Sequence, residues 1–227
     1  MSQNTQEIRT LAYVLRRTNY GEADRIINFL TPNGKISAIA KSARKEKSKL
    51  AGGIEMFCLS DINVHQGNSD LGTLTSAKML KFHSNLMTDI AHLELASLIL
   101  KKVNLAIDNS DSEIFFKIVD QSLTALNAQK SPSLVEAWFW LNFAKACGEE
   151  VNLFRDTEGQ KLNPDTHYIW DIAENALRAH PNGDINADAI KLMRLMLASD
   201  FSIIARVKNV ELLLPPILFI ARAVNKI

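Results

Sequence analysis

The stretch RIINFLTPNGKISAIA (residues 25–40) decides how the amino-terminal part of this chain folds. Two runs rich in β-branched and aromatic residues, 25–30 and 35–40, flank the turn sequence Thr31-Pro32-Asn33-Gly34. Asn-Gly between two such runs is a strong hairpin signal, because both residues tolerate the positive φ angles of tight turns. The sequence therefore predicts two antiparallel strands joined over residues 31–34.

Three further strands are predicted around this hairpin. Residues 8–17 precede it, and residues 56–65 and 71–80 follow it, with turn-forming residues between the last two. Gly52-Gly53 permits a sharp change of direction before the fourth strand. Five strands with mostly short connections predict a small β-barrel, and the strand count suits an OB-fold and an SH3-like barrel equally well.

The pattern changes to helices after Lys81. Apolar residues recur every three or four positions from 86 to 107, which predicts a long helix. Ser110-Asp111-Ser112-Glu113 is a capping box that opens a second helix. Ser131-Pro132 starts a third, which stops at Gly148. An irregular stretch with a short hairpin is then expected over 149–170, and further helices are expected over 171–179, 186–198, 200–207 and from Pro215-Pro216 to Lys226.

The stretch KSARKEKSK (residues 41–49) carries five basic residues and one acidic residue. It holds no apolar side chain larger than that of Ala43, so we expect a flexible, exposed, cationic loop. Phosphate groups are the natural partner of such a loop, although a solvated charge run is the alternative. Residues 1–81 carry 12 Lys and Arg against 7 Asp and Glu, whereas residues 82–227 carry 14 against 18. The basic half is therefore the half that would bind a polyanion.

Several residues of the predicted barrel extend this basic character. Tyr13 and Tyr20 could stack on nucleic-acid bases, although Tyr13 is expected in the core. The predicted binding is electrostatic and tolerant of sequence, since no element is suited to reading base edges. The additional cations on predicted strands are Arg9, Arg16, Arg17, Arg25 and Lys35.

No catalytic constellation is recognisable. The chain lacks the GxxxxGK[ST], GxGxxG and GxSxG motifs, so we expect neither an enzyme nor a bound cofactor. Cys58 and Cys147 are expected as buried apolar groups, Trp138 as core, and Trp140 as a contact residue. No signal peptide and no apolar run of about 20 residues is present, which predicts a soluble cytoplasmic protein. The histidines lack metal-ligand spacing and are expected at surface or half-buried structural positions: His65, His83, His92, His167 and His180.

An ordered series of short motifs gives the chain a family resemblance. Together they resemble the RecO family of DNA repair and recombination mediators, over about a third of the chain. The motifs are Val14-Leu15-Arg16, Tyr20-Gly21-Glu22-Ala23-Asp24-Arg25-Ile26, Leu30-Thr31, Gly34-Lys35-Ile36, Ala40-Lys41-Ser42-Ala43-Arg44, Lys47-Ser48, Leu50 and Leu71-Gly72-Thr73-Leu74-Thr75.

The resemblance implies an α+β protein with an amino-terminal five-stranded OB-fold β-barrel (residues 1–81) followed by an all-α helical domain (residues 82–227). It implies binding of single- and double-stranded DNA, annealing of complementary strands, and work with RecR and the SSB carboxy-terminal tail to load RecA without ATP. The expected location is cytoplasmic and nucleoid-associated. The candidate DNA-binding residues are Arg16, Arg25, Lys35, Lys41, Arg44, Lys45, Lys47 and Lys49.

Two departures from the family pattern stand out. Ser42 occupies a position where the family usually has glycine, and a side chain there could restrict close approach of a phosphate. The four-cysteine zinc site that many members carry is absent, since residues 147–170 hold only Cys147. The irregular stretch must then be held by packing alone. A protein-interaction adaptor that docks an acidic peptide tail, without direct DNA binding, remains the alternative function.

Overall fold

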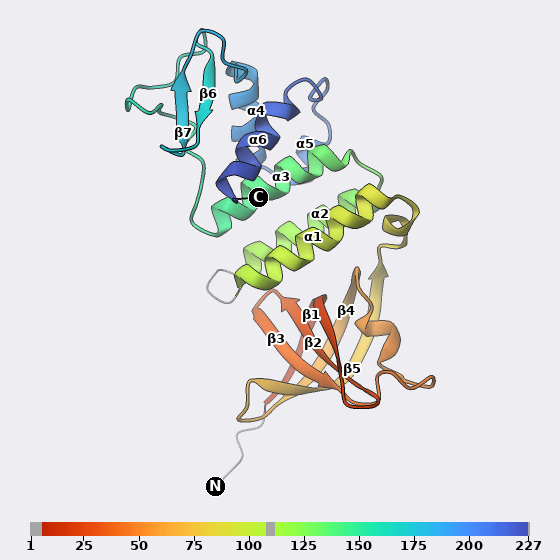
Figure 1. Cartoon of the computed structure of the whole chain (residues 1–227). Helices are drawn as coiled ribbons and strands as arrows, with labels where there is room; N and C mark the ends of the chain where they lie inside the picture. Colours follow the sequence, from red (N-terminus) through yellow and green to blue (C-terminus); the bar gives the residue numbers. More distant parts are fainter. Residues whose placement is uncertain (1–5, 108–111, 227) are drawn as a thin grey trace. The chain divides into compact units, whose positions relative to one another are not determined.

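The computed structural model describes residues 6–107 and 112–226. The chain divides into two compact units, Met1–Asn127 and Ala128–Ile227 (Figure 1). The predicted domain boundary at residue 81 follows the change from strands to helices, and it stays a prediction. No helix among the described residues combines the length and apolar character that a membrane crossing requires.

The first unit contains a closed five-stranded barrel with the strand order β1-β2-β3-β5-β4. Strands β3 and β5 pair in parallel, and the other neighbours pair antiparallel. The predicted OB-fold barrel and the α+β class are thereby confirmed. The five strands are β1 (Gln6–Tyr20), β2 (Asp24–Thr31), β3 (Gly34–Ala40), β4 (Cys58–Gln66) and β5 (Leu71–Phe82).

The hairpin that decides the fold forms as predicted. Thr31 pairs with Gly34, leaving Pro32 and Asn33 as the turn residues. The Thr31 hydroxyl donates to the Gly34 carbonyl at 2.7 Å, and it accepts from the Asn33 backbone N–H at 3.2 Å. Gly34 has a φ of +140°, which only glycine adopts readily. The turn sequence therefore fixes the register of β2 and β3.

The barrel core consists of side chains that alternate along each strand. Ala12 and Val14 of β1 face Ile27 and Phe29 of β2 in this core. The segment between β3 and β4 also contributes, through Ala43, Leu50 and Ile54 at one end of the barrel. The short 3₁₀ helix η1 (Ala51–Ile54) lies in this segment. The connection between β3 and β4 thus serves as an apolar plug as well as a link.

Two helices pack on the outside of the barrel. The described elements after β5 in this unit are the 3₁₀ helix η2 (Ser84–Thr88), α1 (Ile90–Ala106) and α2 (Ser112–Asn127). The Ser112 hydroxyl donates to the carbonyl of Pro32 in the β2–β3 turn at 3.1 Å. In Figure 1 these helices lie above the barrel, and the loop that follows β3 lies below it. The Ser110-Asp111 part of the predicted capping box lies outside the described residues.

Tyr13 joins the barrel to these helices. It lies between the core residues Ala12 and Val14, so it points away from the barrel interior, and it is fully buried beneath the helices, as predicted for a core residue. Its hydroxyl donates to Asp120 Oδ1 of α2 at 2.7 Å, and His83 Nε2 lies 3.2 Å from the same oxygen. Burial raises the pKa of Tyr13, and the bond to Asp120 raises it further.

His83 is the neutral member of this network. Because Tyr13 gives its one proton to Asp120, His83 Nε2 must be the donor to the Tyr13 oxygen. His83 Nδ1 is buried and has no hydrogen-bond partner within residues 6–107 and 112–226. Burial lowers the pKa of His83 to about 4, and the charge of Lys81 acts in the same direction. The expectation of surface or half-buried histidines is therefore wrong for His83 and also for His92, both of which are buried.

The second unit is built on three packed helices. The helix α3 (Pro132–Ala146) begins at the predicted cap Ser131 and contacts α4 (Ala187–Ala198) and α6 (Leu214–Val224). Trp138 is buried as predicted, with its indole N–H bonded to the Ser199 carbonyl at 3.1 Å. The short helix α5 (Phe201–Ile204) follows α4.

Three sequence predictions for this unit are wrong. Trp140 is fully buried, because α3 is covered on nearly all sides and has no exposed face for an apolar contact residue. Cys147 is exposed, because it lies at the carboxyl end of α3, where the helix gives way to a turn. Residues 171–179 form no helix. They contain most of the hairpin of β6 (Tyr168–Asp171) and β7 (Ala176–Ala179).

The hairpin and the stretch before it are held by side chains that bond to nearby backbone groups. Asp171 accepts from the N–H groups of Ala173 and Glu174, which closes the turn between β6 and β7. Asp156 accepts in the same way from Glu158 and Gln160. Such Asx turns replace regular secondary structure where none forms. Among the described residues, no group of three or more His, Cys, Asp and Glu could hold a metal ion.

The buried His83 predicts how stability depends on pH. Its folded-state pKa is about 4, against 6.5 when exposed, so the unfolded chain binds the proton more readily. Stability should therefore fall as the pH drops from about 6.5 toward about 4, by at most about 1.4 kcal/mol per pH unit from this group. Urea unfolding of wild type and His83→Phe at pH 7 and pH 4.5 measures this loss. The variant should lose less stability than wild type, and equal losses would contradict this role for His83.

Candidate nucleic-acid interface

The basic loop, residues 41–49, follows β3 directly and consists of consecutive turns. The structure records no ion pair for its basic side chains among the described residues. Ala43, in the middle of the loop, is only 3% exposed and packs into the barrel core. The loop therefore anchors itself by one small apolar group and directs its charges to solvent. The exposed cations are Lys41, Arg44, Lys45, Lys47 and Lys49.

Hydrogen bonds to the β1–β2 turn hold the loop in place. The Ser42 N–H donates to Asp24 Oδ1 at 2.6 Å, and the Arg44 N–H donates to the Ala23 carbonyl at 2.8 Å. The Arg44 guanidinium also reaches the Gly21 carbonyl at 3.4 Å. The loop was expected to be flexible, but these bonds fix its first four residues. Its cations are thus presented from a defined backbone.

Ser42 adopts the backbone conformation that favours glycine. Its φ of +53° lies in the left-handed region, where a Cβ atom is unfavourable. This gives a physical reason for a glycine at this position that differs from close approach of a phosphate. The Ser42 N–H is already occupied by the Asp24 carboxylate, so it is not available to bind an anion.

Two of the predicted strand cations lie on strands next to the basic loop. Arg25 pairs with Ala40, the residue that precedes the loop, and is partly exposed. Arg16 is exposed on β1, opposite Asn28 of β2. Neither residue has a recorded ion pair in the described part of the chain. Arg25 therefore lies next to the start of the loop, whereas Arg16 lies further along the barrel, level with Asn28 and Ser37.

Three other strand cations are engaged elsewhere. Arg9 forms an ion pair with Asp61 at 2.5 Å, which raises the pKa of Arg9 and lowers that of Asp61. Arg17 binds Glu55 at 2.7 Å. Lys35 lies at the far end of β3 from the loop, about 20 Å away along the strand, and donates to the Asn104 carbonyl at 3.2 Å. Arg9, Arg17 and Lys35 are therefore engaged in contacts within the protein.

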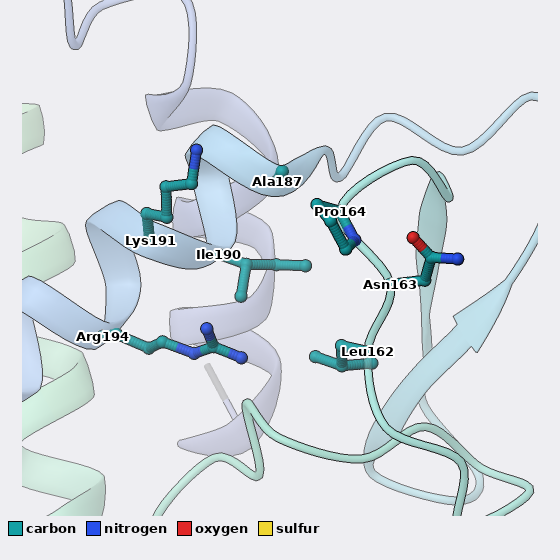
Figure 2. Close-up of a pocket in the computed structure, with 7 residues that line it drawn as sticks. All are labelled: Leu162, Asn163, Pro164, Ala187, Ile190, Lys191 and Arg194. Carbon is teal, nitrogen blue, oxygen red and sulfur yellow. The ribbon is translucent and has the colours of Figure 1, made fainter.

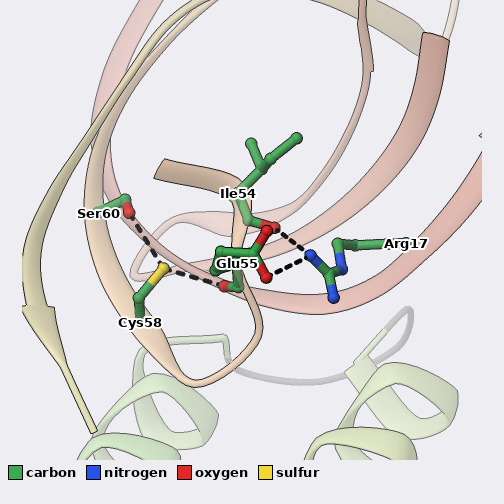
Figure 3. A network of polar contacts seen from close by, with 5 residues as sticks. All are labelled: Arg17, Ile54, Glu55, Cys58 and Ser60. Carbon is green, nitrogen blue, oxygen red and sulfur yellow. Dashed lines mark hydrogen bonds and ion pairs between the residues drawn. The ribbon is translucent and has the colours of Figure 1, made fainter. Parts of the chain in front are cut away.

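The Arg17 pair belongs to a network that fixes the start of β4 (Figure 3). The Arg17 guanidinium also reaches the Ile54 carbonyl at 3.5 Å. The Cys58 thiol donates to the Glu55 carbonyl at 2.9 Å and lies 3.5 Å from the Ser60 hydroxyl. Burial raises the pKa of Cys58, which keeps it protonated and a poor nucleophile. This network is structural and contributes no reactive group.

The second unit holds a small cavity of about 190 Å³ (Figure 2). Ile190 and Arg194 of α4 point toward a loop that contributes Leu162 and Pro164. Lys191 also lines the cavity but points away from that loop and pairs with Asp188 at 3.0 Å. Arg194 Nε donates to the Leu153 carbonyl at 3.1 Å, which holds the guanidinium in position. The cavity thus combines an apolar wall with positive charge.

Comparison with known proteins finds a family model and several relatives that are similar to this chain. Residues 1–83 match the family model described as Recombination protein O N terminal. A protein of Dehalococcoides mccartyi (strain CBDB1), named DNA repair protein RecO, is 29% identical over 220 residues, which cover 91% of this chain and 85% of the relative. The protein of the same name from Roseiflexus sp. (strain RS-1) is 32% identical over 147 residues, covering 64% of this chain and 52% of the relative.

The chain is thus similar over most of its length to proteins named DNA repair protein RecO.

All eight predicted DNA-binding residues lie within the part that matches the RecO model. The structure brings six of them, the five loop cations and Arg25, to one end of the barrel. Arg16 lies level with Asn28 and Ser37, and Lys35 lies toward the other end. Sequence reasoning missed Asp24 as a functional residue. Asp24 was quoted within the family motif, but its partner Ser42 is 18 positions away, and only the fold brings the two together.

The hydrogen bond between the Ser42 N–H and Asp24 predicts the effect of changing Asp24. Asp24→Ala removes the acceptor of the Ser42 N–H, so the loop should open more often and the protein should lose about 1–3 kcal/mol of stability. Hydrogen exchange of residues 41–49 and urea unfolding measure the two effects. Asp24→Asn keeps an acceptor and should exchange more slowly than Asp24→Ala. The exposed Asp70 provides the control substitution, Asp70→Ala. If hydrogen exchange of residues 41–49 is as slow in Asp24→Ala as in this control, Asp24 does not hold the loop in place.

Proposed function

We propose that this chain is a DNA repair and homologous recombination mediator that binds single- and double-stranded DNA through the basic loop. The observation that carries the proposal is five exposed cations on an anchored loop, with no recorded ion pair among the described residues. The relatives' name, DNA repair protein RecO, supports the same role. Arg16 and Arg25 extend the binding surface onto β1 and β2. Lys35 is included as a more distant contact.

The loop would act on phosphates and not on bases. Lysine and arginine side chains neutralise the DNA backbone and release its counterions, which gives affinity without sequence preference. Because hydrogen bonds hold the first four residues of the loop, binding costs less conformational entropy than it would for a flexible tail. Neutralising two strands at once lowers the repulsion between them, and base pairing then supplies the specificity of annealing. No nucleotide hydrolysis is needed for these steps.

The proposed partners follow from the family. We infer that the chain works with RecR and with SSB-coated DNA to help load RecA. The proposal assigns no catalytic residue, and it places the protein in the cytoplasm with the nucleoid.

Neutralising the loop tests the proposal. A variant with Lys41, Arg44, Lys45, Lys47 and Lys49 all changed to Gln should bind single-stranded DNA more weakly and anneal complementary strands more slowly. The logarithm of affinity should also depend less steeply on the logarithm of salt concentration, by about 0.7 for each phosphate that the variant no longer neutralises. Titrations across a salt series, with and without SSB, measure both properties.

A control variant changes Arg206, Lys208 and Lys226, exposed cations of the second unit, to Gln. It should keep the salt slope of wild type. An unchanged slope and affinity in the loop variant would refute the role of the loop in DNA binding.

The same measurements address the alternative, an adaptor that docks an acidic peptide tail such as that of SSB. The cavity of Figure 2 favours such a tail in addition to DNA, because Arg194 lies beside its apolar wall and Lys191, which pairs with Asp188, also lines it. Titration with an acidic peptide should be weakened by Lys191→Glu and unaffected by the loop variant. Peptide binding without any DNA binding by wild type would favour the adaptor over the mediator.

A further inference from the structure

The outer surface of β1, β2 and β3 carries an exposed aromatic residue, Tyr20, to which the proposed function gives no role. Ile27 of β2 and Ala38 of β3 fill the barrel core and lie opposite one another. Their neighbours Ile26 and Ile39 also lie opposite one another, and alternation directs them to the outer surface. Both are partly exposed. An apolar strip therefore crosses the outside of these two strands.

The end of β1 lies beside this strip. The pairing of β1 with β2 is irregular between Val14 and Arg16, which shifts the alternation of β1 by one residue. After the shift, Thr18 pairs with Ile26 and Tyr20 pairs with Asp24. Thr18 and Tyr20 therefore share the outer surface with Ile26, and Arg16 joins them, opposite Asn28.

Tyr20 is exposed, unlike the other two tyrosines of the chain. Its exposed fraction is 53%, whereas Tyr13 and Tyr168 are 0% and 2% exposed. No recorded bond among the described residues joins Tyr20 to helix α1 or α2. One helical contact on this surface, the bond of Asn28 to Asn104 at 3.2 Å, lies further along β2 from Tyr20. An aromatic ring is thus left open at the end of the strip nearest the basic loop.

Positive charge borders this ring on one side. Gly21 follows Tyr20, and its carbonyl accepts from the Arg44 guanidinium. Lys41 follows β3 two residues after Ile39, at the same end of the barrel. A chain of phosphates lying on Lys41 and Arg44 would pass close to Tyr20.

Negative charge lies close to the ring itself. Glu22 is exposed in the β1–β2 turn, and Asp24 is the cross-strand partner of Tyr20. These acids disfavour a phosphate at Tyr20 but do not oppose an uncharged base. The arrangement suits a nucleotide whose phosphate lies on the loop and whose base lies on the ring.

We propose that Tyr20 stacks on an unpaired base of single-stranded DNA, with Ile26 and Ile39 as the adjoining apolar floor. This inference rests on the proposed function and adds a source of preference for single strands. In a duplex the bases are paired and stacked on one another, so their faces are not available to the ring. The basic loop would bind both forms, and Tyr20 would add affinity for single strands alone.

Substitution of Tyr20 tests the proposal. Tyr20→Ala should weaken binding of a short single-stranded oligonucleotide by about 5-fold to 150-fold, the range that corresponds to one stacked base. Binding of a blunt duplex should change by less than about 2-fold. The salt slope should stay that of wild type for both, because the substitution removes no charge. Tyr20→Phe keeps the ring and should bind like wild type.

Photocross-linking supplies a readout that does not depend on affinity. An oligonucleotide containing 5-iodo-deoxyuridine should cross-link to Tyr20 in the wild-type protein, and mass spectrometry of the digested adduct locates the site. Phe219→Ala is the matched control, because Phe219 is also 53% exposed but lies on α6 in the second unit. It should alter neither single-strand affinity nor the cross-link.

The outcomes separate this inference from the proposed function. Wild type that binds neither single strands nor duplex overturns both. Wild type that binds both, with Tyr20→Ala unchanged on single strands and the cross-link elsewhere, overturns only the stacking role. Equal losses of single-strand and duplex affinity in Tyr20→Ala would also overturn it, since stacking on an unpaired base cannot weaken duplex binding.

Discussion

The bond between the Ser42 N–H and the Asp24 carboxylate is the constraint on which the proposed interface depends. It ties the segment after β3 to the turn between β1 and β2, and it holds Ser42 in the left-handed conformation. That conformation directs Ala43 into the barrel core while the flanking cations remain exposed. A loop so rich in like charge would otherwise repel itself and stay disordered. One buried methyl group and a few hydrogen bonds replace the large apolar side chains that normally fix a loop.

The same barrel sorts its cations into two groups. Arg9 is paired with Asp61 of the neighbouring strand β4, and Arg17 is paired with Glu55, which ends η1. Lys35 bonds a helix carbonyl, so all three residues contribute to the structure. The loop cations have no recorded ion pair among the described residues and are exposed. Charge that is not neutralised within the protein is what a polyanion can use. The length of β2 separates the loop from the helices that bond the β2–β3 turn, so the helices leave this end of the barrel open.

Local sequence patterns predicted the barrel strands well, but they did not predict which residues form ion pairs with the strand cations. The Asn33-Gly34 turn and the cap at Ser131 are local signals, and the elements they mark are present. The helix predicted over residues 171–179 is wrong because short apolar runs suit a helix and a strand equally. The turn that Asp171 stabilises favours the hairpin. The prediction of Trp140 as an exposed contact residue is wrong because a helix that is buried on nearly all sides has no exposed face. The partners of Arg9 and Arg17 lie 52 and 38 positions away, beyond the reach of any local pattern.

Lysine acetylation footprinting tests the central claim most directly, because it reports each loop amine separately. The protein is treated with a limited amount of acetylating reagent, with and without a saturating single-stranded oligonucleotide, and modification is located by mass spectrometry. The account predicts that DNA slows acetylation of Lys41, Lys45, Lys47 and Lys49, while Lys208 in the second unit reacts at an unchanged rate. Equal acetylation of the loop lysines with and without bound DNA would contradict it.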